Sequence, residues 1–282
     1  MKFSVGITLY QPKDEYINRI NMISEEFDKV FVYDNSFDRV KSVDKLIKNP
    51  KVTYTFNGEN KGLANAYNYF LENTLDSFDF LCILDQDSHF TNENISKMKK
   101  FLERNNNEAL AIAAPSYSNL SLNNKSKNEQ NIKVKWVINS GSFLNLKLIK
   151  KHNFKYDSNY FLDRIDSDFC KMINRKNLDI IVHKKSILDQ ELGYLYNKRS
   201  AHHPVRHYYI FRDRMYYNQK FYNKATSIVL STLQSFKHLT NIIVFEDNKV
   251  KKINACVRGY KDFKDKKTGE ISSDLKKGES SR

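Results

Sequence analysis

Two aspartates, Asp85 and Asp87, stand two residues apart directly after an apolar run, a pattern able to hold a metal ion. The run at 80–84 is typical of a buried strand, so the pair would lie where that strand ends. Two carboxylates there offer hard oxygen ligands to a divalent cation that also contacts a diphosphate. Phe90 stands where an EF-hand loop needs glycine, which excludes that calcium motif. A solvated pair of acids in a turn is the alternative.

Three further aspartates, Asp163, Asp166 and Asp168, fall within six residues. Three carboxylates so close together repel one another unless cations or protons compensate their charge. Asp166 stands where a helix predicted over 166–175 would begin, and a carboxylate in that position can act as a general base if it reaches an acceptor hydroxyl. The alternative is that these acids cap the helix and favour its dipole, which suits Asp168 in the first turn well.

The elements that would position these acids follow from the apolar periodicity of the chain. Strands are predicted at 2–8, 29–33, 51–56, 78–84, 110–114, 133–138 and 180–182, and helices at 14–27, 62–73, 93–104 and 166–175. Alternating strands and helices predict an α/β fold with a mostly parallel sheet covered on both faces. Ligands bind at the carboxyl ends of the strands in such sheets. Polar residues collect at those ends, at 8–10, 34–36, 57–62 and 85–87.

Composition and missing motifs exclude several classes of protein. The 282 residues are 40% hydrophobic, enough for a sizeable core, so a wholly disordered chain is excluded. No GxGxxG follows the first strand and no GxxxxGK[ST] occurs, which argues against a dinucleotide-binding dehydrogenase and a P-loop NTPase. Cys82, Cys170 and Cys256 form no CxxC pair, which indicates reduced thiols in a cytosolic protein.

The excess positive charge is concentrated in the last 85 residues. Residues 198–282 hold 19 basic and 8 acidic side chains, a net of 19 − 8 = +11 out of +14 for the chain. Seven Tyr and Phe residues between 208 and 222 alternate with basic ones, and apolar residues at helical spacing follow. Three interpretations stay open: a helical region on an anionic membrane surface, a nucleic-acid site, or core-packing helices with a solvated lysine face. The apolar run at 225–236 is shorter than a membrane-spanning helix.

Eight short motifs follow one another along the chain: TLY (8–10), DNS (34–36), NKGLANAYN (60–68), LDQDS (84–88), SGS (140–142), IDSDFC (165–170), LG (192–193) and HPVRHYYIFR (203–212). Taken together, these motifs resemble those of family 2 glycosyltransferases of the GT-A fold. Within that family the chain looks similar to the bacterial rhamnosyltransferase-like branch of capsule, exopolysaccharide and O-antigen synthesis. The LDQDS and NKGLANAYN runs are the most specific of these motifs.

The resemblance implies roles for individual residues. Asp166 would be the catalytic base that deprotonates the acceptor. The nucleotide-sugar would be bound by Thr8, Tyr10, Asp34, Asn60, Gly62, Asp85 and Arg206. A Mn²⁺ or Mg²⁺ ion would be held by Asp85, Asp87, Gln190 and His203. The acceptor, or the residues behind the site, would involve Trp136, Ser140, Gly141, Asp163 and Asp168.

One position departs from the family pattern. Relatives often carry histidine where this chain has Gln190, in the run QELG at 190–193. Glutamine offers a carbonyl oxygen, which is a weaker metal ligand than an imidazole nitrogen. His202 or His203 would be the nearby substitutes, so which residue completes the metal shell stays open.

The expected function is inverting transfer of a sugar, L-rhamnose from dTDP-rhamnose, to a lipid-linked saccharide in bacterial surface polysaccharide synthesis. Galactosyl, galactofuranosyl or glucosyl transfer from a UDP-sugar is the alternative within the fold. A non-catalytic protein that binds nucleic acid or a membrane surface is the alternative of another class. The leading expectation places a GT-A catalytic domain at 1–200 and a helical, basic region at 201–282 that associates with membrane or oligomerises. It assigns no nucleic-acid partner and a cytoplasmic location, peripheral on the inner face of the plasma membrane.

Overall fold

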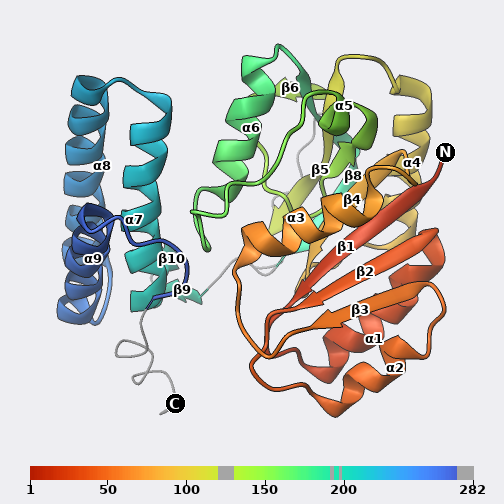
Figure 1. Cartoon of the computed structure of the whole chain (residues 1–282), viewed down its shortest axis with the longest axis horizontal. Coiled ribbons are helices and arrows are strands. Elements are labelled where there is room, and N and C mark those ends of the chain that lie inside the picture. Colours follow the sequence, from red (N-terminus) through yellow and green to blue (C-terminus); the bar gives the residue numbers. More distant parts are fainter. Residues whose placement is uncertain (120–129, 191–193, 197–198, 272–282) are drawn as a thin grey trace. The chain divides into compact units, whose positions relative to one another are not determined.

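The computed structural model describes residues 1–119, 130–190, 194–196 and 199–271 (Figure 1). The chain divides into two compact units. The sheet unit comprises Met1–Tyr156 and Asp166–Glu191, and the helical unit comprises Asp157–Ile165 and Leu192–Arg282. The LG motif at 192–193 lies outside the described residues.

The strands of the described chain form one large sheet and one small hairpin. They are β1 (Phe3–Leu9), β2 (Lys29–Asp34), β3 (Val52–Phe56), β4 (Phe80–Asp85), β5 (Leu110–Asn119), β6 (Ile132–Val134), β7 (Phe143–Asn145), β8 (Asp179–Gln190), β9 (Tyr194–Tyr196) and β10 (Arg199–Ala201). The hairpin is the antiparallel pair β9 and β10 in the helical unit.

Helices follow most of the strands of the sheet unit and make up most of the helical unit. The α-helices are α1 (Asp14–Ile23), α2 (Asp44–Ile47), α3 (Leu63–Thr74), α4 (Asn92–Asn105), α5 (Leu146–Lys151), α6 (Ile165–Arg175), α7 (Pro204–Phe221), α8 (Lys224–Phe245) and α9 (Lys249–Lys264). Two short 3₁₀ turns, η1 (Ser24–Glu26) and η2 (Lys41–Val43), precede β2 and α2.

The large sheet has the order β3-β2-β1-β4-β7-β5-β8-β6 (Figure 1). Its first four strands are parallel, as are β5 and β8, whereas β7 runs antiparallel to both β4 and β5. Helical crossovers join the parallel strands, as their geometry requires. The predicted fold class, a mostly parallel sheet flanked by helices with further helices at the C-terminal end, is confirmed.

Alternation along the strands separates a structural face of the sheet from the face that carries the acids. Every second residue of β1 and β4, such as Val5 and Cys82, joins a core with α1, α2 and α4. The residues between them face α3. Gly6 lies so close under α3 that an added Cβ would come within 2.3 Å of the Phe70 ring. By the same alternation Thr8 and Asp85 belong to the α3 face.

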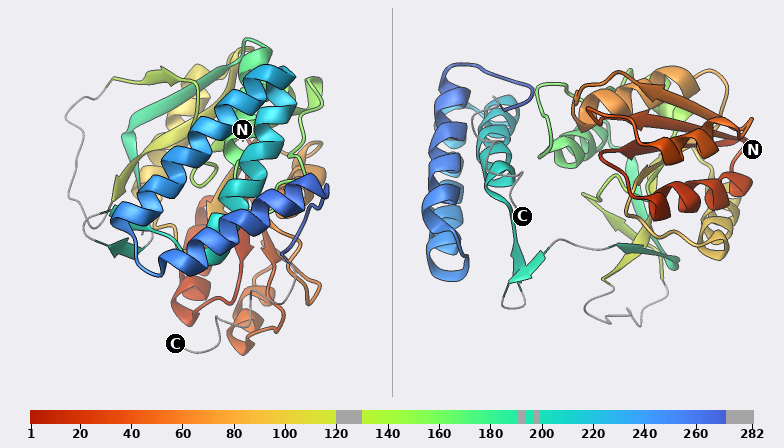
Figure 2. Two further views of the ribbon diagram at one scale, coloured as in Figure 1. Left: turned by 90° about the vertical axis from the view of Figure 1, so that its left-hand side faces the viewer. Right: turned by 90° about the horizontal axis from the view of Figure 1, so that it is seen from below.

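The helical unit is built from α7, α8 and α9, which pack against one another (Figure 2). Helix α7 begins at Pro204, where a residue without an N–H costs no hydrogen bond, and His203 precedes it as the capping position. One core cluster joins Phe161 to Tyr208 and Tyr209. The Phe161 ring stacks on that of Tyr209, and the Tyr208 ring packs edge-on against Tyr209. A second core joins residues of all three helices: Phe211, Met215, Ile242 and Cys256.

Helix α8 leaves most of its apolar side chains exposed. Phe236 is 74% exposed, and Leu233 and Ile228 are similarly open. By length and composition alone, α8 is the one helix of the described chain able to cross a membrane. Of its most apolar stretch of 18 residues, 6% is buried. The run at 225–236 had indicated otherwise because it was counted only as far as the charged Lys237, whereas the helix continues to Phe245.

Candidate functional site

The candidate site begins where β1, β2 and β4 end side by side. Thr8 of β1 pairs with Asp85 of β4, and Leu9 pairs with Asp34 of β2. Tyr10 and Gln86 continue the pairing through two hydrogen bonds: the Tyr10 N–H donates to Gln86 Oε1 at 2.9 Å, and Gln86 Nε2 donates to the Tyr10 carbonyl at 3.0 Å. The polar residues predicted at separate strand ends therefore share one edge of the sheet.

The loop that carries Asp85 and Asp87 is fixed from both sides. Ser140 Oγ accepts a 3.1 Å hydrogen bond from the Asp85 N–H and lies 2.5 Å from Ser88 Oγ. From α1, Arg19 Nη1 donates to the backbone carbonyls of Asp87 and Ser88 at 3.3 and 3.4 Å. A loop held in this way presents its carboxylates without first having to become ordered.

Gly141 allows the SGS turn to reach β4. Its N–H donates to the Ile83 carbonyl at 2.7 Å, and its φ of +78° favours glycine. A Cβ at this position would lie 2.8 Å from the Pro115 ring and 2.9 Å from Leu188. Ser140 can approach Asp85 only because its neighbour has no side chain.

Asp166 lies in the first turn of α6, and a chain of hydrogen bonds orients it. Asn139 Nδ2 donates to Asp166 Oδ1 at 2.5 Å, and the Tyr156 hydroxyl donates to Asn139 Oδ1 at 3.1 Å. Tyr156 stacks on Phe169 of α6 with ring centroids 4.1 Å apart. The carboxylate is thus positioned by side chains that are themselves buried and packed.

Tyr67 of α3 connects the two groups of acids. Its side chain is buried and hydrogen-bonds Asp85. Burial raises the pKa of Tyr67 well above its usual value, and the nearby carboxylates of Asp85 and Asp166 raise it further. Asp85 and Asp166, 81 positions apart in the chain, therefore act on one phenol. Tyr67 belongs to the NKGLANAYN motif, but its contact with the acids could be found only from the three-dimensional structure.

Asp34 is fully buried and engaged by the protein itself. Its Oδ1 accepts the Ser36 N–H at 2.9 Å, and its Oδ2 accepts the Tyr54 hydroxyl at 2.6 Å. Burial and this hydrogen bond raise the pKa of Tyr54, so the phenol remains a donor. A carboxylate has about four acceptor positions, so two remain for a ligand.

Asn60 and Gly62 shape the loop before α3. Asn60 Oδ1 accepts the Gly62 N–H at 2.9 Å, and Gly62, at φ +80°, stands in the capping position of the helix. Asn35, next to Asp34, binds the same loop: its Oδ1 accepts the Lys61 N–H at 3.1 Å. The start of α3, where backbone N–H groups have no partner within the helix, is thereby tied to the end of β2.

Carboxylates and an unpaired hydroxyl make this edge suitable for a divalent cation. Asp85 and Asp87 supply the hard oxygen donors that Mg²⁺ and Mn²⁺ prefer. Thr8, paired with Asp85, is 6% exposed, and its Oγ1 has no hydrogen-bond partner among the described residues. A buried hydroxyl left unpaired costs free energy unless something binds there. The residues present fit the implied metal.

The end of β8 brings Gln190 to the same loop. His89 forms a bridge to Asp189, with N–H···O bonds of 2.8 and 3.1 Å in the two directions. The antiparallel bridge puts the backbone of Gln190 beside Ser88. Its side chain lies outside what the structure describes, so its predicted role as a metal ligand stays a prediction.

The remaining predicted residues are divided between the two units. His203, Arg206 and Asp163 belong to the helical unit, so their predicted roles at the site stay predictions. The Asp163 N–H donates to Asp213 Oδ2 at 3.4 Å, and its carboxylate pairs with Arg164 at 3.4 Å. In the sheet unit, Asp168 is buried in the first turn of α6, and Trp136 is 51% exposed.

Comparisons with known proteins agree with this fold. Residues 14–181 match Glycosyl transferase family 2, and the chain belongs to that family. Crystal structures of S. aureus TarS resemble it: TarS 1-349 in complex with UDP-GlcNAc has a TM-score of 0.57 at 16% identity, covering 90% of this chain and 79% of that one. GalNAc-T7 with UDP, GalNAc and Mn²⁺ has a TM-score of 0.55 at 10% identity, covering 74% and 47%. No curated protein sequence matches significantly.

The fold and family define a nucleotide-sugar transferase of the GT-A type. The likeness to TarS and GalNAc-T7 concerns the fold, since identities of 16% and 10% do not transfer a substrate. The family match does not distinguish the rhamnosyl branch that the motifs predict from other branches of the family, so that assignment stays a prediction.

Proposed function

We propose that this chain is a metal-dependent, inverting glycosyltransferase that moves a sugar from a nucleoside-diphosphate donor to a lipid-linked saccharide. The observation that supports it most is the chain of contacts that joins Asp85 to Asp166. Tyr67 hydrogen-bonds Asp85 and packs its ring 5.1 Å from that of Tyr156, whose hydroxyl holds the Asn139 amide that donates to Asp166. Acids brought together from two distant segments suit one reaction centre. A non-catalytic binding sheet would gain nothing from both.

Asp85 and Asp87 would hold the divalent cation together with the donor diphosphate. A bound Mg²⁺ or Mn²⁺ supplies positive charge that stabilises the departing diphosphate. The protein's part is to fix the two carboxylates, which Ser140 and Arg19 do through the loop backbone. Asp34 and the start of α3 would bind the nucleotide beside them.

Asp166 would act as the base. Its carboxylate accepts the proton of an acceptor hydroxyl while that oxygen attacks the anomeric carbon and the bond to the diphosphate breaks. A single displacement inverts the anomeric centre and needs one base, unlike a glycosidase with its two carboxylates. Asn139 Nδ2 donates to Oδ1 of Asp166, which orients the carboxylate for this role.

For the donor, the motifs favour dTDP-rhamnose in bacterial surface polysaccharide synthesis. A UDP-sugar is the second candidate, because the TarS neighbour was crystallised with UDP-GlcNAc and the GalNAc-T7 neighbour with UDP and Mn²⁺. The two candidate donors differ in their nucleobase and sugar. Both would use the same metal ion, the same diphosphate leaving group and Asp166 as the catalytic base.

The helical unit would bring the enzyme to the inner face of the plasma membrane. Helix α8 exposes a row of apolar side chains, and residues 198–282 carry a net charge of +11. Exposed apolar groups and basic groups together favour the surface of an anionic membrane. A lipid-linked acceptor would be met there.

A donor panel tests the proposal. The full chain is incubated with dTDP-rhamnose and a series of UDP-sugars, each with and without Mn²⁺, and the released nucleoside diphosphate is measured. One donor should give metal-dependent release above the level of an Asp87→Asn variant. If no donor gives release or transfer under any metal condition, the non-catalytic alternative takes the place of the proposal.

A further inference from the structure

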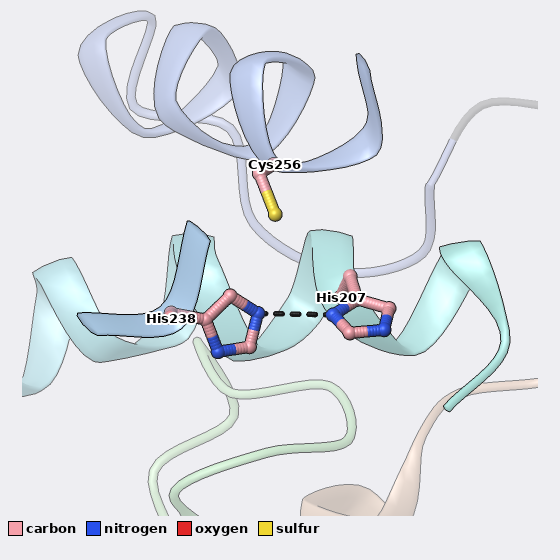
Figure 3. Close-up of side chains that lie close together, drawn as sticks. All are labelled: His207, His238 and Cys256. Atoms are coloured by element: carbon pink, nitrogen blue, oxygen red, sulfur yellow. Dashed lines mark hydrogen bonds between the residues drawn. The ribbon is translucent and has the colours of Figure 1, made fainter. Parts of the chain in front are cut away.

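The helical unit contains a cluster of metal-ligating side chains that the transferase reaction does not use. His207 of α7, His238 of α8 and Cys256 of α9 place one ligand atom each within 4.8 Å of the others. Figure 3 shows the Cys256 sulfur pointing toward the two imidazole rings. His207 and Cys256 are fully buried. We propose that these three residues bind a structural Zn²⁺ ion that ties the three helices together.

The ligand atoms can close around a tetrahedral zinc ion if the side chains adjust. His207 Nδ1 and His238 Nε2 are 2.9 Å apart and share a hydrogen bond (Figure 3). In tetrahedral zinc sites, bond lengths of about 2.0–2.3 Å place the ligand atoms about 3.3–3.6 Å apart. The two nitrogens need to separate by a few tenths of an ångström, and ligand atoms up to 4.8 Å apart need to approach by about 1 Å. A water molecule would take the fourth position.

His207 has the second partner that a metal-bound histidine commonly has. Its Nε2 lies 3.1 Å from Glu246 Oε2, and Lys252 Nζ holds the same carboxylate at 2.8 Å. When Nε2 carries the ring proton and donates it to Glu246, Nδ1 keeps a lone pair, which faces His238 and Cys256. A carboxylate behind the histidine fixes its tautomer and strengthens it as a ligand.

The surroundings favour neutral histidines and oppose a free thiolate. Burial lowers the pKa of both His207 and His238, so neither ring carries a proton charge near neutral pH. Burial raises the pKa of Cys256 to about 12, while nearby Arg214 lowers it. Binding would form one zinc–sulfur and two zinc–nitrogen bonds and release the thiol proton to solvent. The proton that His238 Nε2 shares with His207 would move to His238 Nδ1, so that Nε2 can bind the ion. The soft thiolate and two imidazoles select Zn²⁺ over the Mg²⁺ or Mn²⁺ proposed for the sheet unit.

Zinc content and cobalt spectroscopy on the full chain test this site. The protein is loaded with Zn²⁺, passed over a column to remove free ion, and titrated with a chromophoric chelator. We expect one tightly held Zn²⁺ per wild-type chain. Cys256→Ser and His238→Gln should weaken it roughly 100-fold or more, and Glu246→Gln roughly 10-fold. With Co²⁺ in place of Zn²⁺, a thiolate-to-metal charge-transfer band should appear in the near ultraviolet.

Two controls separate this site from other causes. Cys170→Ser makes the same chemical change at a buried thiol in the sheet unit, next to the Val137 carbonyl, and should leave zinc bound. Asp87→Asn removes a donor of the proposed transferase metal and should also leave it bound. A cobalt complex of the wild type without a charge-transfer band, or undiminished zinc affinity in a folded Cys256→Ser variant, would overturn the proposal.

Discussion

Asp85 at the end of β4 and Asp166 in the first turn of α6 are joined through two buried tyrosines. Tyr67 hydrogen-bonds Asp85, and its ring lies 5.1 Å from that of Tyr156, which reaches Asp166 through Asn139. Neither helix nor strand alone brings them together. Helix α3 covers the face of the sheet to which Asp85 points, and Asn139 of the adjoining turn holds Asp166. Asp85, a proposed metal ligand, and Asp166, the candidate base, are therefore positioned by the same group of buried side chains.

Replacing Asp166 by asparagine should abolish transfer and leave donor binding intact. The amide keeps the shape of the side chain but cannot accept the acceptor's proton, and loss of a general base typically costs about 10²- to 10⁴-fold in rate. Transfer is measured with the active donor, and donor affinity by calorimetry. Asp76→Asn is the matched control, since Asp76 is an exposed acid paired with Lys150. Loss of donor binding in Asp166→Asn would assign the residue another role.

Tyr67→Phe should weaken donor and metal binding by roughly 10-fold, the size of one hydrogen bond to a charged group. The hydroxyl that bonds Asp85 is lost while the ring remains in place. The pKa of Tyr67 is raised, so its hydroxyl stays protonated as the pH rises, and the loss should be the same in neutral and mildly alkaline buffer. Tyr69→Phe, on the same helix, removes a hydroxyl bonded to Thr55 and serves as control. Equal affinities for Tyr67→Phe and wild type would contradict the prediction.

The strand ends of the sheet unit could be predicted from the sequence because apolar runs and polar turns follow each other regularly there. The pairing of Thr8 with Asp85 follows from such ends once the strands are parallel neighbours. By contrast, β7 is only Phe143–Asn145, too short to show a period, and its antiparallel placement between β4 and β5 cannot be inferred from local pattern.

Other features of the site depend on contacts between distant segments. Asp163 and Asp166 stand three residues apart in sequence, yet they belong to different units of the structure. The local sequence gives no sign that Tyr67, Asn139 or Tyr156 belongs to the site. Only the fold brings these side chains close to Asp166. The zinc cluster cannot be inferred from a short motif, because its three ligands come from three helices.

Gly141→Ala should lower both stability and activity. A left-handed backbone disfavours alanine by about 1 kcal/mol, and the clash with Pro115 and Leu188 should add about 1–3 kcal/mol. Displacement of Ser140 would then loosen the loop at Asp85. Gly269→Ala is the control, with a similar φ of +73° and no atom near the added Cβ. Denaturant unfolding compares the two, and equal losses would contradict the packing argument.

Phe236→Ser should reduce binding to anionic vesicles by roughly 10-fold, since burying a large apolar side chain contributes about 1.5–3 kcal/mol. Phe236 is exposed on α8, so its replacement should leave folding unchanged. Val250→Ser changes an equally exposed apolar residue on α9 and is the control. Sedimentation with vesicles gives the affinity at low and high salt, and the basic charge predicts weaker binding at high salt. Unchanged binding of Phe236→Ser would show that α8 is not the contact.

The most direct test of the central claim is Mn²⁺-dependent binding of the active nucleoside diphosphate, measured by calorimetry in wild type, Asp87→Asn and Asp166→Asn. The account predicts that Asp87→Asn loses the metal-dependent part of the affinity, whereas Asp166→Asn retains it and loses only transfer. Binding that is independent of Mn²⁺ in the wild type, or unaffected by Asp87→Asn, would contradict it.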